Sequence, residues 1–192
     1  KTIEPAMELD IPVRVRNAFK PEHEGTLIVR KPERVKEIVR AITASKNVSL
    51  ITVGGAGMIG VPGVAAAVFD ILGRAGTKVL MISQSSSQAN ISLAVDRKDL
   101  DVALSALQEG FAERHVDWSI ECDRDVSLIA TVGAGMKGTP GVAARVFNTM
   151  GRNKVNILMI AQGSSELNIS FAIDEQDVVK AVRALHDEFL SA

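Results

Sequence analysis

At 192 residues, with 46% hydrophobic residues, 23% charged residues and a net charge of -1, the chain has the composition of an ordinary globular protein. The near-zero charge and the lack of Lys/Arg runs exclude the usual signals for nucleic-acid binding, and no apolar stretch approaches the ~20 residues that cross a bilayer. The lone cysteine, Cys122, excludes a disulfide framework and predicts a reducing, cytoplasmic setting.

The first 30 residues predict two short strands, IPVRVRN and GTLIV, joined by the polar turn KPEHEG. The chain opens at Lys1 without a methionine and without a recognisable helix or strand start. We therefore expect this opening to belong to the C-terminal piece of a longer protein.

A repeat dominates the rest of the sequence. VSLITVGGAGMIGVPGVAAAVF, from Val48, aligns without a gap with VSLIATVGAGMKGTPGVAARVF, from Val126, and the same offset joins Gln84 to Gln162. Self-similarity at one offset indicates that the same supersecondary unit is built twice.

Within the first repeat, hydrophobic periodicity predicts the order β-α-β-β-α-β, an antiparallel sheet covered by helices on one face. The expected strands are 48–53, 79–83, 91–95 and 116–121, and the expected helices are 62–72 and 100–111.

The second repeat ends before its fourth strand, and an unpaired sheet edge is costly. Residues 40–45 are placed to supply that strand, which predicts that the first repeat is inserted within the second. A short helix through Val35, Ile38, Val39 and Ile42 is the alternative. We assign one domain to 47–125 and the other to 38–46 plus 126–192, as two interleaved, side-by-side ferredoxin-like units of the α+β class.

Each repeat carries GxGxxG between a strand and a helix, as GAGMIG at 55–60 and GAGMKG at 133–138. A dinucleotide site is disfavoured, because Gln84 and Gln162 follow the second strand where an acidic residue is needed, and because an antiparallel hairpin replaces the parallel crossover. The glycines can instead bring unpaired helix amides close to a small anion such as an amino-acid carboxylate. Tight turns that bind nothing are the alternative.

The residue before each proline differs between the two turns. Thr139 can cap the second helix, whereas Val61 cannot cap the first. We therefore expect the first turn to offer more free donors.

The segments VLMISQSSSQANISLAV and ILMIAQGSSELNISFAI resemble those of the tandem ACT domains of aspartate kinases, and KTIEPAMELDIPVRVRNAF resembles the end of the catalytic domain of that family. The resemblance covers essentially the whole chain. It implies that residues 1–37 are the tail of a catalytic domain with its linker. It also implies that the parent enzyme phosphorylates L-aspartate with ATP and Mg²⁺, through motifs that are absent here, so this chain itself needs no cofactor.

The resemblance further implies feedback inhibition by an end-product amino acid, bound between the start of one helix and the second strand of a facing unit. The first such site would comprise Gly60, Pro62, Gly63, Ala65 and Gln84, facing Asn156 and Ile157. The pseudo-symmetric site would comprise Gly138, Gly141, Ala143 and Gln162, facing Lys78 and Val79. Lys78 departs from the Asn-Ile pattern of the other repeat.

Lysine-sensing members of the family tend to carry an acidic residue on the second strand, where this sequence has Leu80 and Leu158. An ammonium group without a partner is costly to desolvate, so the resemblance favours threonine over lysine as the effector. Unpaired sheet edges predict a homodimer or a higher oligomer. A lysine-sensing region and a stand-alone ACT module for amino-acid binding or oligomerisation are the alternatives.

The remaining polar residues form no catalytic or metal-binding pattern. His23, His115 and His186 are scattered, without a Cys or acidic residue at ligand spacing. The chain ends at Ala192 soon after its last helix, so we expect no fused homoserine dehydrogenase.

Overall fold

The computed structural model describes residues 3–29 and 37–191, and the chain divides into an N-terminal unit, 1–36, and a main unit, 37–192. The N-terminal unit contains the helix α1 (Glu4–Glu8) and the antiparallel strands β1 (Val13–Val15) and β2 (Thr26–Ile28). The two strands confirm the prediction. The helix was not predicted, because five residues are too few to show a periodic pattern.

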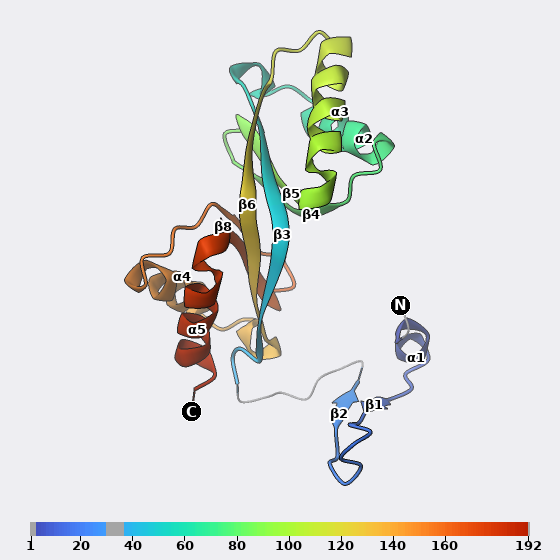
Figure 1. The fold of residues 1–192 in the computed structure, drawn as a ribbon, viewed down its shortest axis with the longest axis vertical. Coiled ribbons are helices and arrows are strands. Elements are labelled where there is room, and N and C mark those ends of the chain that lie inside the picture. The colour runs from blue at the N-terminus through green and yellow to red at the C-terminus, as the bar shows by residue number, and fades with distance from the viewer. Residues whose placement is uncertain (1–2, 30–36, 192) are drawn as a thin grey trace. The chain divides into compact units, whose positions relative to one another are not determined.

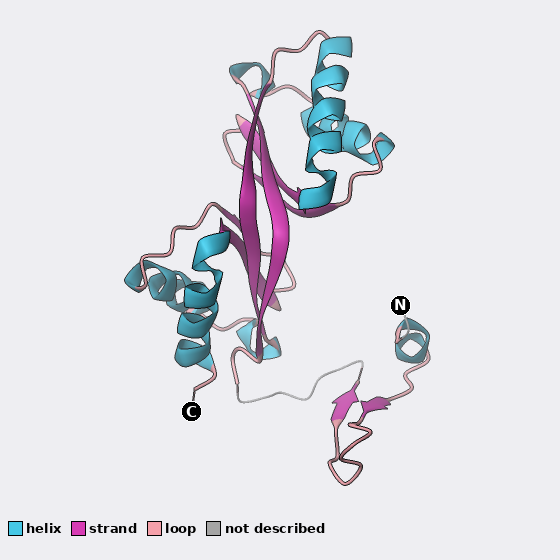
Figure 2. Cartoon of the chain, viewed as in Figure 1, coloured by secondary structure: helices cyan, strands magenta, loops and turns pink. Residues whose placement is uncertain are grey.

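The main unit is built on a single antiparallel sheet with the order β4-β5-β3-β6-β8-β7, and its two helix pairs lie at opposite ends of the long strands β3 and β6 (Figures 1 and 2). The elements in chain order are β3 (Ala41–Gly54), α2 (Val64–Arg74), β4 (Val79–Gln84), β5 (Asn90–Asp96), α3 (Leu100–Glu113), β6 (Ser119–Val132), α4 (Val142–Arg152), β7 (Met159–Ala161), β8 (Asn168–Asp174) and α5 (Val178–Phe189).

Strands β3 and β6 each serve both repeats. The 50–54 part of β3 pairs with 119–123 in the first repeat, and its 41–45 part pairs with 128–132 in the second. The strand predicted at 40–45 is therefore confirmed. The alternative helix is wrong for residues 37–42, none of which is helical, and its Val35 lies outside the described residues.

The sequence divided each long strand into two. Residues 41–45 and 48–53 belong to one 14-residue strand, whose register shifts at Val48 and where Asn47 has φ +60°. The strand expected from residue 116 begins at Ser119 and continues through the one expected from Val126. The predicted domain boundaries, 46/47 and 125/126, thus fall inside continuous strands, and the domain division stays a prediction.

The repeat is also visible in the cores. The helices of each repeat pack on the strands around a separate cluster of buried apolar residues. Fully buried members are Ile51, Val68, Leu93 and Leu107 in one cluster, and their equivalents Ile129, Val146, Phe171 and Leu185 in the other. A third cluster, formed by strand residues alone, includes Val48, Leu50, Met81, Val126 and Met159. Because all three clusters lie within one sheet system, the two repeats form a single body.

Candidate functional site

Two equivalent glycine turns connect the long strands to α2 and α4. In the first turn Gly60 and Gly63 have φ values of +71° and +86°, and in the second Gly138 and Gly141 have +68° and +85°. These left-handed conformations favour glycine. A Cβ atom added at any of the four would meet nothing within 4 Å, so the space beside both turns is open.

Both helices begin without a side-chain cap. The N-cap residues are Gly63 and Gly141, and neither helix start receives a side-chain hydrogen bond. The prediction that Thr139 caps α4 is wrong, because its hydroxyl donates to the carbonyl oxygen of Gly135 at 2.7 Å. The helix starts therefore do not differ in the way the sequence predicted, and both leave amide donors at the positive end of the helix dipole.

Each glycine turn is fastened to the hairpin of its own repeat. The N–H of Gly55 donates to the carbonyl oxygen of Ala89 at 3.1 Å, and the equivalent bond from Gly133 to Leu167 is 3.0 Å long. The β4–β5 hairpin therefore lies beside the first turn, and the β7–β8 hairpin lies beside the second. These backbone bonds hold the ends of β4 and β7 near the glycines.

Side chains of the two hairpins reach the turns as well. Gln88 accepts a hydrogen bond from the N–H of Gly60 at 3.2 Å, and Glu166 accepts one from the N–H of Gly138 at 2.7 Å. The sequence analysis did not identify these two residues. Their common offset, equal to that of the repeat, was the signal that could have found them.

The structure brings together the residues predicted for one side of each site. Gly60, Pro62 and Gly63 lie in the first turn, and Pro62 precedes the N-cap rather than starting the helix as predicted. Ala65 lies in the first turn of α2 and packs partly into the core. Gln84, the last residue of β4, lies directly before the loop of the adjoining hairpin. Its side chain is exposed and has no hydrogen bond in the described chain.

The second repeat places its residues in the same way. Gly138 and Gly141 lie in the turn, and Ala143 packs partly into the second core. Gln162 follows β7 directly and is exposed. Each repeat therefore presents one glutamine and one glycine turn at the same end.

The residues predicted to face these sets are not joined to them within the chain. Asn156 and Lys78 are exposed, whereas Ile157 and Val79 pack partly into the two helix-covered cores. Within 37–191, no side-chain hydrogen bond or ion pair links Asn156 to the first turn or Lys78 to the second. A site that uses both sides therefore stays a prediction.

Two hollows in the main unit lie away from the predicted effector residues. One, of about 650 Å³, lies between α2 and α3 and is lined by several charged side chains, among them Asp70, Arg74, Asp101, Glu109, Glu113 and Arg114. The other, of about 250 Å³, is lined by strand residues that include Ser45, Leu80, Leu128 and Ser170. Neither is lined by any of the predicted effector-site residues.

The described residues contain no group of three or more His, Cys, Asp or Glu side chains that could hold a metal ion. Nor do they contain a helix of the length and apolar character that crossing a membrane requires.

Comparison with known proteins identifies the repeat. A family model described as an ACT domain matches residues 51–111 and 129–189. The chain is 36% identical to the bifunctional aspartokinase/homoserine dehydrogenase 1, chloroplastic, of Arabidopsis thaliana, over 98% of this chain and 22% of that protein. The chain therefore spans about a fifth of the length of this relative.

Solved structures of aspartate kinases have the same fold as this chain. The regulatory subunit of aspartate kinase from Thermus thermophilus, ligand-free form, superposes with a TM-score of 0.71 at 29% identity, covering 80% of this chain and 99% of that chain. The E. coli aspartokinase III in complex with lysine and aspartate superposes with a TM-score of 0.79 at 30% identity, covering 99% and 41%. The resemblance found in the sequence, and the fold class predicted from its repeat, are confirmed.

Proposed function

The chain belongs to the ACT domain family, and from this premise we propose that it is the regulatory region of an aspartate kinase that binds an end-product amino acid. The observation that carries the proposal is the pair of open glycine turns, each followed by an uncapped helix and each beside an exposed glutamine. In this proposal 47–125 forms one ACT domain, inserted in a second formed by 38–46 and 126–192. Residues 1–37 end a cytoplasmic kinase domain, which would bind ATP and Mg²⁺ and phosphorylate L-aspartate.

The physical basis for binding is the set of amides at the start of α2. Backbone N–H groups without side-chain caps at a helix N-terminus are suited to a carboxylate, and the left-handed glycines remove the side chains that would exclude it. The exposed amide of Gln84 can donate to or accept from the polar groups of the same ligand. An effector bound in this way inhibits the enzyme if it binds one of two states of the protein more tightly than the other.

We propose threonine as the effector, with lysine as the alternative. Leu80 and Leu158 offer no partner to an ammonium side chain, although each is 39% exposed in the single chain. The desolvation argument therefore requires a facing unit that covers these leucines. Because the structure of E. coli aspartokinase III contains bound lysine, lysine is also a candidate effector and L-lysine is included among the ligands to be titrated.

We propose that the edge strands β4 and β7 join copies of the chain. Both are at the edges of the sheet, and edge strands present unpaired backbone groups that favour pairing with a second chain. Their exposed apolar residues, Leu80, Ile82, Leu158 and Ile160, are each 39–46% exposed. Pairing of these edges would bury the leucines and bring a second copy toward the glycine turns.

The substitution Gln84→Ala tests the proposed site. Loss of one hydrogen bond to the ligand is worth about 0.5–1.5 kcal/mol, so we expect roughly three- to tenfold weaker binding. Isothermal titration of the wild type and the variant with L-threonine, L-lysine and L-methionine measures this. Because the side chain is exposed and makes no hydrogen bond within the described part of the chain, the free energy of unfolding should change by less than about 0.5 kcal/mol.

Gln108→Ala is the matched control, because Gln108 is an exposed glutamine on α3, outside the predicted site. Equal affinities for the Gln84→Ala variant and the wild type would remove Gln84 from the site. A loss of thermal stability would instead make Gln84 a structural residue. If none of the three amino acids binds the wild type, the oligomerisation module becomes the better interpretation.

A further inference from the structure

The two glycine turns have the same backbone geometry but different side chains on their hairpins. Gln88 and Glu166, at equivalent positions, have left-handed φ values of +58° and +56°. Their backbone N–H groups donate to the carbonyl oxygens of Ser85 and Gly163, each at 3.0 Å, so the loops of the two hairpins have the same hydrogen bond. Both side chains then accept a hydrogen bond from a turn glycine. The repeat therefore provides an internal comparison in which a carboxamide is replaced by a carboxylate.

That replacement changes the chemistry of the turn. A hydrogen bond to an ionised carboxylate is shorter and roughly twice as strong as a neutral one, and the bond to Glu166 is the shorter of the two. A ligand carboxylate at the start of α4 would meet the negative charge of Glu166, and could accept from the N–H of Gly138 only by displacing that side chain. At the first turn the side chain displaced, Gln88, is neutral.

We infer that the Glu166 carboxylate is a built-in competitor at the second glycine turn, so that an amino-acid carboxylate binds at the first turn in preference to the second. The inference rests on the proposed function, because it assumes that the effector carboxylate binds beside the glycine turn, at the start of the helix that follows it. It adds that the two turns of one chain are not equivalent sites.

Lys137 is the other charged residue of the second turn, and its equivalent in the first turn is Ile59. Lys137 is exposed and forms no ion pair within 37–191. Its ammonium group offsets the charge of Glu166 but does not free the N–H of Gly138. When Glu166 is replaced by a neutral glutamine, the second turn should therefore carry a net positive charge and attract a carboxylate.

The test compares Glu166→Gln with the reciprocal variant Gln88→Glu. The 192-residue chain, labelled with ¹⁵N, is titrated with L-threonine and separately with L-lysine, while the amide signals of Gly60 and Gly138 are followed. In the wild type, Gly60 should respond at an effector concentration at least about tenfold lower than Gly138, since one charge-assisted contact is worth about that factor.

In Glu166→Gln, the midpoint at Gly138 should fall by at least about tenfold, while that at Gly60 stays unchanged. In Gln88→Glu, the midpoint at Gly60 should rise by a similar factor. Both variants keep an acceptor for the glycine N–H, so the hairpins should stay in place.

Equal midpoints at the two turns of the wild type would overturn the inference and leave the proposed function standing. So would a Gly138 midpoint that does not move in Glu166→Gln. If neither glycine responds to either amino acid in any of the three proteins, the proposed function fails, and this inference fails with it.

Discussion

Gly57 and Gly135 are equivalent residues in sequence but have different surroundings in the structure. A Cβ atom on Gly135 would lie 2.5 Å from the carbonyl oxygen of Glu37 and 2.9 Å from the Cα of Ile38. On Gly57 the nearest atom would be Nε1 of Trp118, at 4.0 Å. The backbone before β3 therefore packs directly on the second glycine turn. Only the second turn needs glycine at this position for lack of space.

We expect Gly135→Ala to lower the free energy of unfolding by about 1–3 kcal/mol, because the added methyl group meets backbone atoms that cannot rotate away. Gly57→Ala should change it by less than about 0.5 kcal/mol, because its methyl group has room. Urea denaturation of both variants measures the difference. Equal effects would show that Glu37 and Ile38 do not pack on the turn.

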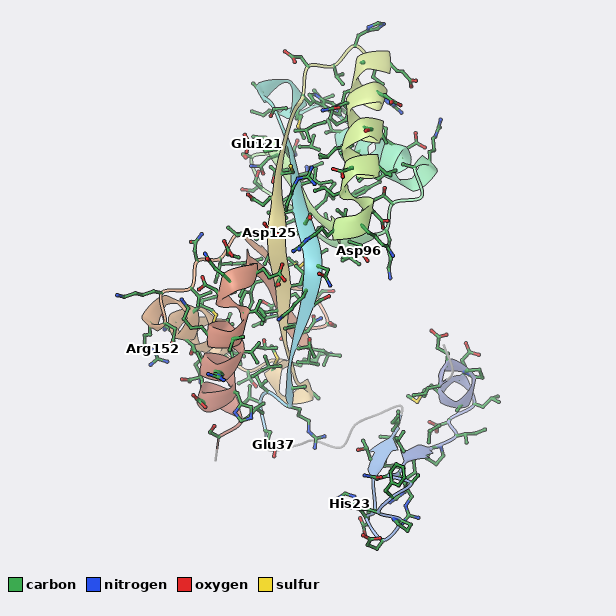
Figure 3. All side chains as sticks on the ribbon, viewed as in Figure 1. His23, Glu37, Asp96, Glu121, Asp125 and Arg152 are labelled. Atoms are coloured by element: carbon green, nitrogen blue, oxygen red, sulfur yellow. The ribbon has the colours of Figure 1, made fainter. Side chains whose placement is uncertain are left out.

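At the scale of elements, the two helix pairs are held together by different contacts. In the first pair, α3 has Gly110, where a Cβ atom would lie 2.6 Å from Cδ1 of Ile71 on α2. In the second pair, the equivalent of Gly110 is Glu188, which accepts hydrogen bonds from Arg145 at 2.9 Å and Arg152 at 3.0 Å. At this position, a close apolar contact in the first pair is thus replaced by a charge cluster in the second, where Arg152 lies on α4 (Figure 3). The first pair has an ion pair elsewhere, between Arg114 and Asp70.

The hydrogen bond from Arg145 holds the pKa of Glu188 below its ordinary value, and Arg152 adds to this effect. A carboxyl group whose pKa is lower in the folded state contributes stability above its unfolded pKa, and this contribution is lost as pH falls through the folded pKa. We expect Glu188→Gln to destabilise the protein at pH 7. The difference in Tm from the wild type should shrink as the pH falls below about 4.3, the ordinary pKa of glutamate.

Thermal unfolding of both proteins between pH 7 and pH 3 checks this expectation. A difference in Tm that is the same at every pH would show that the loss comes from packing rather than from the charge of Glu188.

At the scale of the whole molecule, one ion pair joins the two repeats at equivalent positions. Arg97 follows β5 and Glu175 follows β8, and their side chains are bonded to each other. The Nη1 atom of Arg97 also lies 3.4 Å from Oδ1 of Asp125. Figure 3 shows Asp125 near the middle of the β3–β6 ribbon. Because the two partners are equivalents in the repeat, the pair lies where the two halves meet. The Nε atom of Arg97 is buried and has no hydrogen-bond partner among the described residues, so the guanidinium group is only partly satisfied.

Reversing one charge should weaken the contact between the repeats. Arg97→Glu places an anion beside Glu175 and Asp125, so we expect a lower Tm that recovers partly at high salt. The double variant Arg97→Glu with Glu175→Arg restores one attractive pair and should regain part of the loss. Differential scanning calorimetry of the two single variants and the double variant measures the coupling. Additive effects in the double variant would show that the two side chains do not act together.

The sequence by itself determined the repeat, its element types and the family. Apolar periodicity at one offset predicts the same helices and strands twice, because periods of 3.6 and 2 residues follow from backbone geometry alone. The missing fourth strand also predicted a strand at 40–45, and the structure has residues 41–45 paired with 128–132. The glycines and glutamines of the candidate site were also visible in the sequence, because each repeats with the same offset.

Only the tertiary structure decided which contacts those residues make. Local pattern cannot show that β3 and β6 run unbroken through both repeats, because the irregularity at Asn47 looks like a strand end in sequence. Nor can it show that Gln88 and Glu166 reach the glycine turns, since those hydrogen bonds join residues 28 positions apart. Contacts between distant residues depend on how the hairpin folds back over the turn. The composition and spacing of the residues do not show where the hairpin loop will lie relative to the glycine turn.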